Sequence, residues 1–341
     1  MIARSKSSLR IGLAGGGTDV SPYSDMYGGA ALNATISMYA YATIKPGNDG
    51  KIVLNSIDRK ERYEGGPMEQ LPIDGKLDLI KGVYNRVVRD YTKKPLSFEI
   101  LTYADAPAGS GLGTSSTVVV TVLGAFKEWL GLPLSEYEMS HLAWEIERND
   151  LKMAGGKQDQ YAATFGGFNF MEFYHDDRVI VNPLRIKKEY LCELEFNMVL
   201  YYTGTSRLSS VIIESQRENV MQKKEKPISA MHKLKEQSLM MKEAILKGRF
   251  HEIGEILDFG WQYKKQMADG ISNPVIDEIY ETALKAGATG GKLSGAGGGG
   301  FMIFYCPGNA RYKVIKELSK FGGEFRRYNF IENGMMSWTA K

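Results

Sequence analysis

A glycine-rich segment in the first half of the chain has the composition of an anion-binding loop. The sequence 107-PAGSGLGTSS-116 alternates glycines with small or apolar residues and ends on three hydroxyl side chains. Glycines let a backbone curl tightly and turn its N–H groups toward a ligand. The apolar run 118–126 continues on one face to Phe126 and Trp129, which predicts a helix although three successive valines favour a strand. The N-terminus of such a helix favours a phosphate in the loop.

Two common phosphate-binding motifs are excluded for this loop. No lysine follows Gly113, as a P-loop requires, and the sixth residue counted from Gly111 is Ser116 where a dinucleotide fingerprint has a glycine. An ordinary tight turn that caps a helix is the alternative interpretation.

A second glycine-rich segment, 290-GGKLSGAGGGG-300, lies near the end of the chain. It contains the pattern GxGxxG at Gly295, Gly297 and Gly300, but it runs into a strand-like sequence, which is the wrong context for a dinucleotide turn. Each glycine loses much backbone entropy on folding. So many glycines would be costly in a segment with a purely structural role. We therefore expect this segment to close against the first half of the chain and a bound nucleotide. A flexible turn is the alternative interpretation.

A third segment, 10-RIGLAGGGTD-19, places an arginine before a short apolar strand and ends on glycines and two polar residues. A glycine turn here would offer polar groups to a hydroxylated ligand, and a simple hairpin is the alternative. The candidate ligand contacts are Gly16, Gly17, Thr18 and Asp19.

The composition is that of an ordinary soluble globule and excludes several classes of protein. Lys and Arg number 43 against 40 for Asp and Glu, which disfavours the broad basic surface of a nucleic-acid binder. No stretch reaches the roughly 18 apolar residues that span a bilayer, and the first residues lack the apolar core of a signal peptide, so we expect a cytoplasmic protein without a membrane partner. The two cysteines form no disulfide framework, and the four histidines share no metal-ligand spacing.

At 341 residues the chain is long enough for two domains. Strand-like runs at 39–45 and 96–103 and helical stretches near 75–91 and 134–150 indicate an α/β or α+β fold in the first half. The charged stretch 185–195 separates two apolar strands, so we place the boundary near residue 190. This predicts the domains 1–190 and 191–341.

The second half opens with a strongly helical region from about 206 to 268, in which we expect breaks at Pro227, Gly248 and Gly254. Asn273 and Pro274 predict the start of another helix, which ends at Gly287. The apolar face of that helix would comprise Val275, Ile276, Ile279, Tyr280, Ala283 and Leu284. The last predicted elements are a strand at 300–306, a helix near 309–321 and a strand near 324–330.

Taken together and in their order along the chain, the three glycine-rich segments resemble those of the GHMP kinases. This superfamily includes galactokinase, homoserine kinase, mevalonate kinase and phosphomevalonate kinase. The resemblance covers nearly the whole chain. The central family motif looks like PxGxGLGSSA, from which 107-PAGSGLGTSS-116 departs mainly at Thr114 and Ser116. The resemblance implies ATP as co-substrate, bound by Pro107, Gly109, Ser110, Gly111, Leu112, Gly113, Thr114, Ser115 and Ser116.

The implied fold is the two-domain α+β fold of the GHMP kinases. Its N-terminal domain is similar to the second domain of ribosomal protein S5, and its C-terminal domain is ferredoxin-like with added helices. ATP and substrate would meet in the cleft between them.

The resemblance also implies roles for individual residues. Arg10 falls where galactokinases place an arginine near the transferred phosphoryl group, and Asp159 falls at the aspartate usually assigned as the base. Ser115 and Glu147 match the family's ligands for Mg²⁺. A carboxylate that accepts the proton of a sugar hydroxyl, beside an arginine that offsets phosphoryl charge, fits phosphoryl transfer.

The first motif separates the subfamilies. Galactokinases and mevalonate kinases carry GEH where this chain has 15-GGG-17, which argues against galactose. The combination of AGGGTD, EIER and GGKQDQYAA is most similar to the bacterial D-glycero-D-manno-heptose 7-phosphate kinases of GDP-heptose synthesis, which phosphorylate the anomeric hydroxyl of an already phosphorylated heptose. A fucokinase-like sugar kinase and a catalytically idle sensor of sugar and ATP are the alternatives.

A substrate that already carries a phosphate needs a cation apart from the groups that handle ATP. Lys157, two residues before the predicted base, and Arg207, in 203-TGTSRLSS-210, are the candidates. Arginine can grip a phosphate with two parallel N–H bonds, which favours Arg207. Both residues have an alternative interpretation as surface charges. Gly297 completes the predicted substrate contacts.

Overall fold

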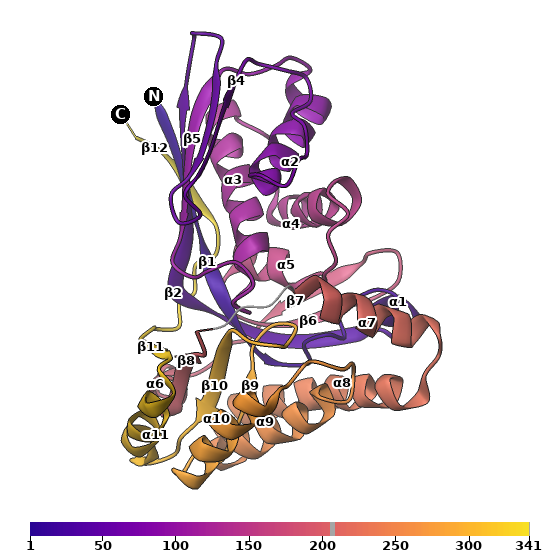
Figure 1. Cartoon of the computed structure of the whole chain (residues 1–341), viewed down its shortest axis with the longest axis vertical. Coiled ribbons are helices and arrows are strands. Elements are labelled where there is room, and N and C mark those ends of the chain that lie inside the picture. Colours follow the sequence, from indigo (N-terminus) through magenta and orange to yellow (C-terminus); the bar gives the residue numbers. More distant parts are fainter. Residues whose placement is uncertain (205–208, 341) are drawn as a thin grey trace.

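The computed structural model describes residues 1–204 and 209–340. Within them the chain forms two sheets, one in the upper and one in the lower part of Figure 1, and helices pack against both. The first sheet follows the order β12-β1-β2-β5-β3-β4, and β6 and β7 extend it from β2. Its strands are β1 (Ile2–Ala14), β2 (Gly29–Pro46), β3 (Ile52–Ser56), β4 (Glu61–Gly65), β5 (Phe98–Ala104), β6 (Phe168–Phe173), β7 (Val179–Pro183) and β12 (Met336–Ala340).

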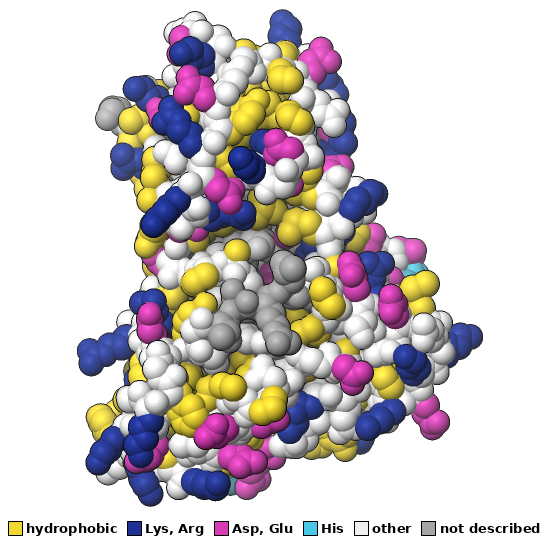
Figure 2. Space-filling view, viewed as in Figure 1, with side chains coloured by type: hydrophobic (Ala, Val, Ile, Leu, Met, Phe, Trp, Pro, Cys, Tyr) yellow, Lys and Arg dark blue, Asp and Glu magenta, His cyan; other side chains and the backbone are white. Residues whose placement is uncertain are grey.

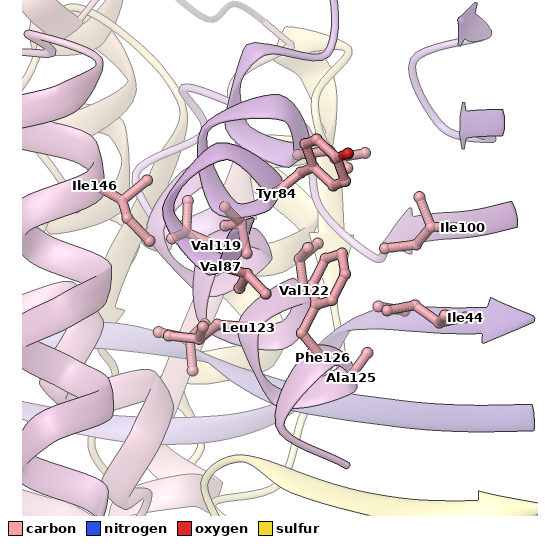
Figure 3. Packing of buried hydrophobic residues seen from close by; sticks show 14 of the residues in the cluster. Ile44, Tyr84, Val87, Ile100, Val119, Val122, Leu123, Ala125, Phe126 and Ile146 are labelled. Carbon is pink, nitrogen blue, oxygen red and sulfur yellow. The ribbon is translucent and has the colours of Figure 1, made fainter. Parts of the chain in front are cut away.

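Helices α2 to α5 lie on one face of this sheet, and α8 and α9 pack against the lower part of β1 and β2 (Figure 1). The central one, α3, begins directly after the first glycine loop, so its predicted helical state is confirmed. Val122 and Phe126 of α3 pack toward Ile44 of β2 and Ile100 of β5, with Tyr84 of α2 beside them (Figure 3). The helices of this half are α1 (Tyr23–Tyr27), α2 (Asp78–Val87), α3 (Thr114–Leu130), α4 (Glu136–Glu145) and α5 (Gln158–Phe165), and π-helical turns extend α2 to Thr92 and α4 to Asp150.

The second sheet has the order β11-β8-β10-β9. Its strands are β8 (Met198–Tyr202), β9 (Gly290–Leu293), β10 (Phe301–Tyr305) and β11 (Glu324–Arg326). The helices around it are α6 (Lys188–Asn197), α7 (Ser209–Met221), α8 (Glu225–Leu246), α9 (Phe250–Lys264), α10 (Pro274–Lys285) and α11 (Ala310–Leu318), which a short 3₁₀ turn extends to Phe321.

An apolar cluster joins the two halves. It contains Leu13 of β1 and Leu32 of β2 from the first sheet, together with Ile245 of α8, Leu257 of α9 and Ile303 of β10. Burial of apolar area shared in this way opposes separation of the halves. The glycine segments that lie at their junction are therefore held in a fixed arrangement.

Two of the three predicted helix breaks in the second half are wrong. Pro227 lies in the first turn of α8, where no intrahelical N–H bond is required of it. Gly254 lies inside α9, where a Cβ would collide with Thr289, so this glycine permits close packing against the segment that leads into β9. The break at Gly248 is confirmed, since α8 ends just before it and the residue has φ +66°.

The start of α10 is as predicted, because the side chain of Asn273 accepts hydrogen bonds from the N–H groups of Val275 and Ile276. The predicted apolar face is only partly correct. Four of its six residues are buried, whereas Val275 and Leu284 are exposed. At about 100° per residue these two fall on opposite flanks of the buried stripe.

The end of the chain returns to the first sheet, which the sequence did not predict. Strand β12 pairs antiparallel with β1, with Ala340 opposite Ile2, whereas the last predicted strand corresponds to β11. The charged stretch around the predicted boundary at residue 190 is helix α6 and not a linker. The division into 1–190 and 191–341 stays a prediction.

None of the helices in the described ranges is long and apolar enough to cross a membrane. On the face drawn in Figure 2, the side chains of Lys and Arg are interspersed with those of Asp and Glu over both halves. This face therefore carries no broad patch of one charge sign.

Candidate active site

A cavity of about 550 Å³ lies where the three glycine-rich segments meet. Gly16 and Gly17 of segment 10–19, Gly109, Gly111 and Gly113 of segment 107–116, and Gly295 with Ala296 of segment 290–300 contribute to its lining. Residues from both halves of the chain therefore surround one space, as expected for a cleft between two domains.

The glycine segments 107–116 and 290–300 close directly against each other. Ser294 Oγ donates to the carbonyl oxygen of Gly111 at 2.7 Å, and the N–H of Phe301 donates to that of Ser110 at 2.8 Å. A Cβ at Gly295 would lie 2.5 Å from the Cα of Gly111. The prediction that the late glycine segment closes against the first half is confirmed, and its glycines are required by this close approach.

Arg10 and Asp159 form an ion pair at the floor of the cavity. Arg10 Nε and Nη2 each lie 2.7 Å from Asp159 Oδ1, and Arg10 Nη1 donates to the carbonyl oxygen of Gly111 at 2.5 Å. Asp159 is in the first turn of α5, and its carboxylate lies against Gly113, the N-cap of α3. The predicted base is thus beside the N-terminus at which the loop would hold phosphate.

Asp19 is close to Asp159 but is surrounded by donors. Its carboxylate accepts hydrogen bonds from the N–H groups of Gly17, Lys157 and Gln158 and from the side-chain amide of Gln158 at 2.9 to 3.2 Å. Four donors occupy the roughly four acceptor positions of a carboxylate. Because two of them are the N–H groups of the N-cap Lys157 and of Gln158, the first residue of α5, Asp19 caps the helix that carries Asp159.

Glu147 is buried at the meeting point of three helices. It lies in the π-helical turn after α4, accepts from Ser116 Oγ of α3 at 3.0 Å and accepts from Gln160 Nε2 of α5. Ser115, the predicted metal partner of Glu147, also lines the cavity, but the hydrogen-bond donor to Glu147 is its neighbour Ser116. Among the described residues no three His, Cys, Asp or Glu side chains group as a metal site by themselves.

Burial shifts the pKa of three ionisable groups in this cavity. Burial, with the Asp159 carboxylate second, raises the pKa of Asp19, while the N–H groups of Gln158 and Gly17 act in the opposite direction. Burial, followed by the charge of Arg10, lowers the pKa of Lys264 to about 8. Burial and the charges of Lys264 and Arg10 lower the pKa of Lys292 well below its usual value.

Comparisons with known proteins agree with this geometry. The model of the GHMP kinases N terminal domain matches residues 78–167, and that of the GHMP kinases C terminal matches residues 241–324. The D-glycero-alpha-D-manno-heptose 7-phosphate kinase of Campylobacter jejuni is 50% identical over 335 residues, which cover 98% of each chain. The chain belongs to the GHMP kinase family.

This GHMP kinase also superposes on a solved structure, a D-glycero-D-manno-heptose 1-phosphate kinase from Bacteroides thetaiotaomicron. The two are 49% identical, with a TM-score of 0.85 and 99% of each chain covered. The predicted two-domain α+β fold of the family is confirmed by this match. The L-fucokinase/L-fucose-1-P guanylyltransferase of Bacteroides fragilis is 30% identical over 356 residues, which cover 96% of this chain and 37% of that protein.

In this GHMP kinase most of the predicted site residues line one cavity. They are Arg10, Gly16, Gly17, Asp19, Gly109, Gly111, Gly113, Thr114, Ser115, Ser116, Glu147 and Asp159. Ser110 and Leu112 are buried within the loop, whereas Pro107 is exposed, and none of these three lines the cavity. Gly297 packs against the backbone of Ile271 instead of lining the cavity.

Two predicted substrate ligands have other partners. The hydroxyl of Thr18 donates to the carbonyl oxygens of Gly15 and Ala30, which closes the glycine turn. Lys157 Nζ lies between Asp25, at 3.1 Å, and Asp177, at 2.8 Å, and does not line the cavity. The structure therefore argues against Lys157 as a phosphate ligand. Arg207 lies outside the described residues.

Several cavity residues of this GHMP kinase were not found from the sequence. Lys264 and Lys292 line the cavity from the second half, and Gln158 and Arg148 from the first. Gln160 does not line the cavity, but its side-chain amide donates a hydrogen bond to Glu147, which does. The charged residues resemble surface lysines and arginines in the sequence, and the glutamines beside Asp159 were the one available signal.

Proposed function

We propose that this chain is an ATP-dependent kinase that phosphorylates the anomeric hydroxyl of D-glycero-D-manno-heptose 7-phosphate. The observation that carries the proposal is the Asp159 carboxylate, held at 2.7 Å by Arg10 and directly beside Gly113 of the phosphate loop. The full-length similarity to the heptose 7-phosphate kinase of Campylobacter jejuni supports the choice of substrate.

In the proposed reaction the glycine loop and the N-terminus of α3 bind the phosphates of ATP through their N–H groups. Asp159 is 25% exposed on its side chain, so a sugar hydroxyl can reach it and transfer its proton there. Arg10 fixes the orientation of that carboxylate and offsets negative charge on the phosphoryl group. Asp19 holds the N-terminus of α5, and therefore Asp159, in position.

The residues around Glu147 fit Mg²⁺. Glu147 is a buried carboxylate whose nearest cationic partner, Arg148, is 3.9 Å away, and Ser115 supplies a hydroxyl in the same cavity. Mg²⁺ binds proteins through one or two carboxylates and the phosphates of its substrate, so a larger protein cage is not needed. Bound there, the ion would neutralise phosphate charge during transfer. Ser116 and Gln160 orient Glu147 through their hydrogen bonds.

Two related activities are the competing proposals. Fucokinase activity is supported by the 30% identity to the bifunctional fucokinase of Bacteroides fragilis. A heptose 1-phosphate as substrate is suggested by the name of the Bacteroides thetaiotaomicron relative, which is 49% identical. An idle sensor is disfavoured because Arg10, Asp159 and Glu147 all line the same cavity.

The test is a screen of the purified protein with ATP and Mg²⁺ against heptose 7-phosphate, heptose 1-phosphate, fucose, mannose and galactose. ADP release measures turnover, and phosphorus NMR identifies the new phosphate ester. We expect heptose 7-phosphate to give the highest kcat/KM and a 1,7-bisphosphate as product. Preference for fucose would replace the proposal, and no ADP release with any sugar would favour the sensor.

A further inference from the structure

Two lysines enter the cavity from the second half of the chain. Lys264 is the last residue of α9, and Lys292 lies on β9, two residues before the Ser294 that bonds to the phosphate loop. Both line the cavity that contains Arg10 and Asp159, and they are only 3% and 5% exposed. Both residues are thus shielded from bulk water while they line the cavity.

These lysines lack the carboxylate partners that buried lysines have elsewhere in this chain. Lys81 is buried and pairs with Asp74 at 2.6 Å, and Lys157 is buried between two aspartates. Within the described ranges, Lys264 donates a hydrogen bond only to the carbonyl oxygen of Gly295, and Lys292 Nζ has no hydrogen-bond or ion-pair partner. Buried charges without partners are costly, and these two are also close to Arg10.

A dianionic ligand would remove this cost. A phosphoryl group carries two negative charges and several acceptor oxygens, and hydrogen bonds to ionised groups are roughly twice as strong as neutral ones. Burial and the charge of Arg10 lower the pKa of both lysines, and the Asp19 carboxylate offsets only part of this effect at Lys264.

We propose that Lys264 and Lys292 form a binding site for a phosphoryl group where the second half of the chain meets the glycine loop of α3. The inference rests on the proposed kinase function, which brings two such groups into the cavity. One is the phosphate that the sugar already carries, and the other is the phosphoryl group in transfer near Arg10. With Lys157 engaged by two aspartates, this pair supplies the cations that a phosphorylated substrate needs.

The experiment compares Lys292→Met and Lys264→Met with the wild type and with Lys265→Met as matched control. Lys265 is the next residue after Lys264, but it lies over the ring of Trp261 and does not line the cavity. Methionine is unbranched and one atom shorter than lysine, so it keeps most of the apolar side chain and removes the charge. Kinetics are measured with heptose 7-phosphate, with unphosphorylated heptose and with varied ATP.

If the pair binds the sugar's own phosphate, each cavity variant raises KM for heptose 7-phosphate by roughly 10- to 100-fold. In that case the kcat of each variant, its KM for ATP and its kinetics with unphosphorylated heptose stay near those of the wild type. If the pair binds the phosphoryl group in transfer, kcat falls for both sugars and the KM values change little. Kinetics equal to those of Lys265→Met with both sugars would overturn the proposal.

A binding readout separates this inference from the proposed function. Phosphate or pyrophosphate alone should raise Tm of the wild type and of Lys265→Met, and should raise Tm of Lys292→Met much less. Without ligand, Lys292→Met should unfold at the same or a higher temperature than the wild type, because an unpaired buried charge is gone. A ligand-free Tm that falls, with the phosphate response retained, would make Lys292 structural and refute the inference. A wild type that binds phosphate but phosphorylates no sugar would refute the proposed function alone.

Discussion

The two sides of the cavity differ in how their charges are neutralised. On the side built by the first half of the chain, Asp159 pairs with Arg10, and Asp19 accepts from four N–H donors. On the side built by the second half, Lys264 and Lys292 have no carboxylate partner among the described residues. The first side therefore neutralises its charges with its own groups, whereas the proposed anion would neutralise those of the second.

The first side also separates two carboxylates by their exposure. The side chain of Asp159 is 25% exposed, so a ligand can contact it, whereas Asp19 is 2% exposed and its acceptor positions are filled. Only Asp159 can therefore take a proton from a substrate, and Asp19 acts by holding α5. The predictions below test this division from the largest expected effect to the smallest.

The largest effect is expected for Asp159→Asn. The amide can still accept from Arg10, so the fold and the affinity for ATP should be retained. Without a carboxylate to receive the proton, turnover should fall by roughly 10² to 10⁴. Steady-state kinetics with heptose 7-phosphate measure the loss, and the ligand-free Tm serves as the control. Near-normal turnover would mean that the hydroxyl loses its proton to another group.

Asp19→Asn should lower both stability and turnover. The asparagine nitrogen cannot accept a hydrogen bond, so about two of the four donors lose their partner, at a cost of about 2 to 6 kcal/mol in the free energy of unfolding. Turnover should fall with it because α5 loses its cap, but by less than in Asp159→Asn. Urea unfolding followed by kinetics on the folded protein measures both. An Asp19→Asn protein that is fully stable and inactive would place Asp19 in the chemistry.

A smaller effect is expected on the dependence on magnesium. Glu147→Gln should raise the Mg²⁺ concentration at half-maximal activity, because a hard oxygen ligand loses its charge. Ser115→Ala should do the same more weakly, and Ser116→Ala provides the matched comparison, since its hydroxyl donates to Glu147. A larger shift of the Mg²⁺ midpoint in Ser116→Ala than in Ser115→Ala would mean that Ser116, and not Ser115, supports metal binding. An unchanged midpoint in Glu147→Gln would remove that residue from the metal site.

The sequence predicted the paired side of the cavity far better than the unpaired side. Arg10 and Asp159 lie 149 positions apart, yet each falls within a motif whose order along the chain identifies the family. Helix α3 and the cap of α10 follow from local rules of glycine loops and Asn–Pro starts. These features are encoded in short segments, which a single sequence displays.

The remaining features depend on contacts between distant segments. Lys264 ends a helix of mixed composition and Lys292 follows two glycines, so both look like solvated charges until the fold buries them. The phase of α3 decides that Ser116 and not Ser115 donates to Glu147. Strand β12 is short and half-exposed, and its pairing with β1 comes from the opposite end of the chain. Local patterns contain no information about such pairings.

The smallest expected effect is a pH dependence of stability caused by Lys264, on the unpaired side of the cavity. Burial lowers the pKa of Lys264 from 10.5 to about 8 in the folded protein, so between these values the unfolded chain binds more protons than the folded one. Stability must then rise with pH across that window, and the cost of the charged lysine is fully present below it. Relative to Lys264→Met, the ligand-free wild type should gain about 2 kcal/mol in its free energy of unfolding between pH 8 and 9.5.

Lys265→Met should keep the slope of the wild type in the same urea titrations, because it leaves Lys264 in place. Saturating phosphate should flatten the slope of the wild type, since an anion beside Lys264 restores its pKa toward the ordinary value. Equal slopes in the wild type and Lys264→Met would show that Lys264 is solvated in the ligand-free protein. The contrast between the paired and unpaired sides would then rest on Lys292 alone.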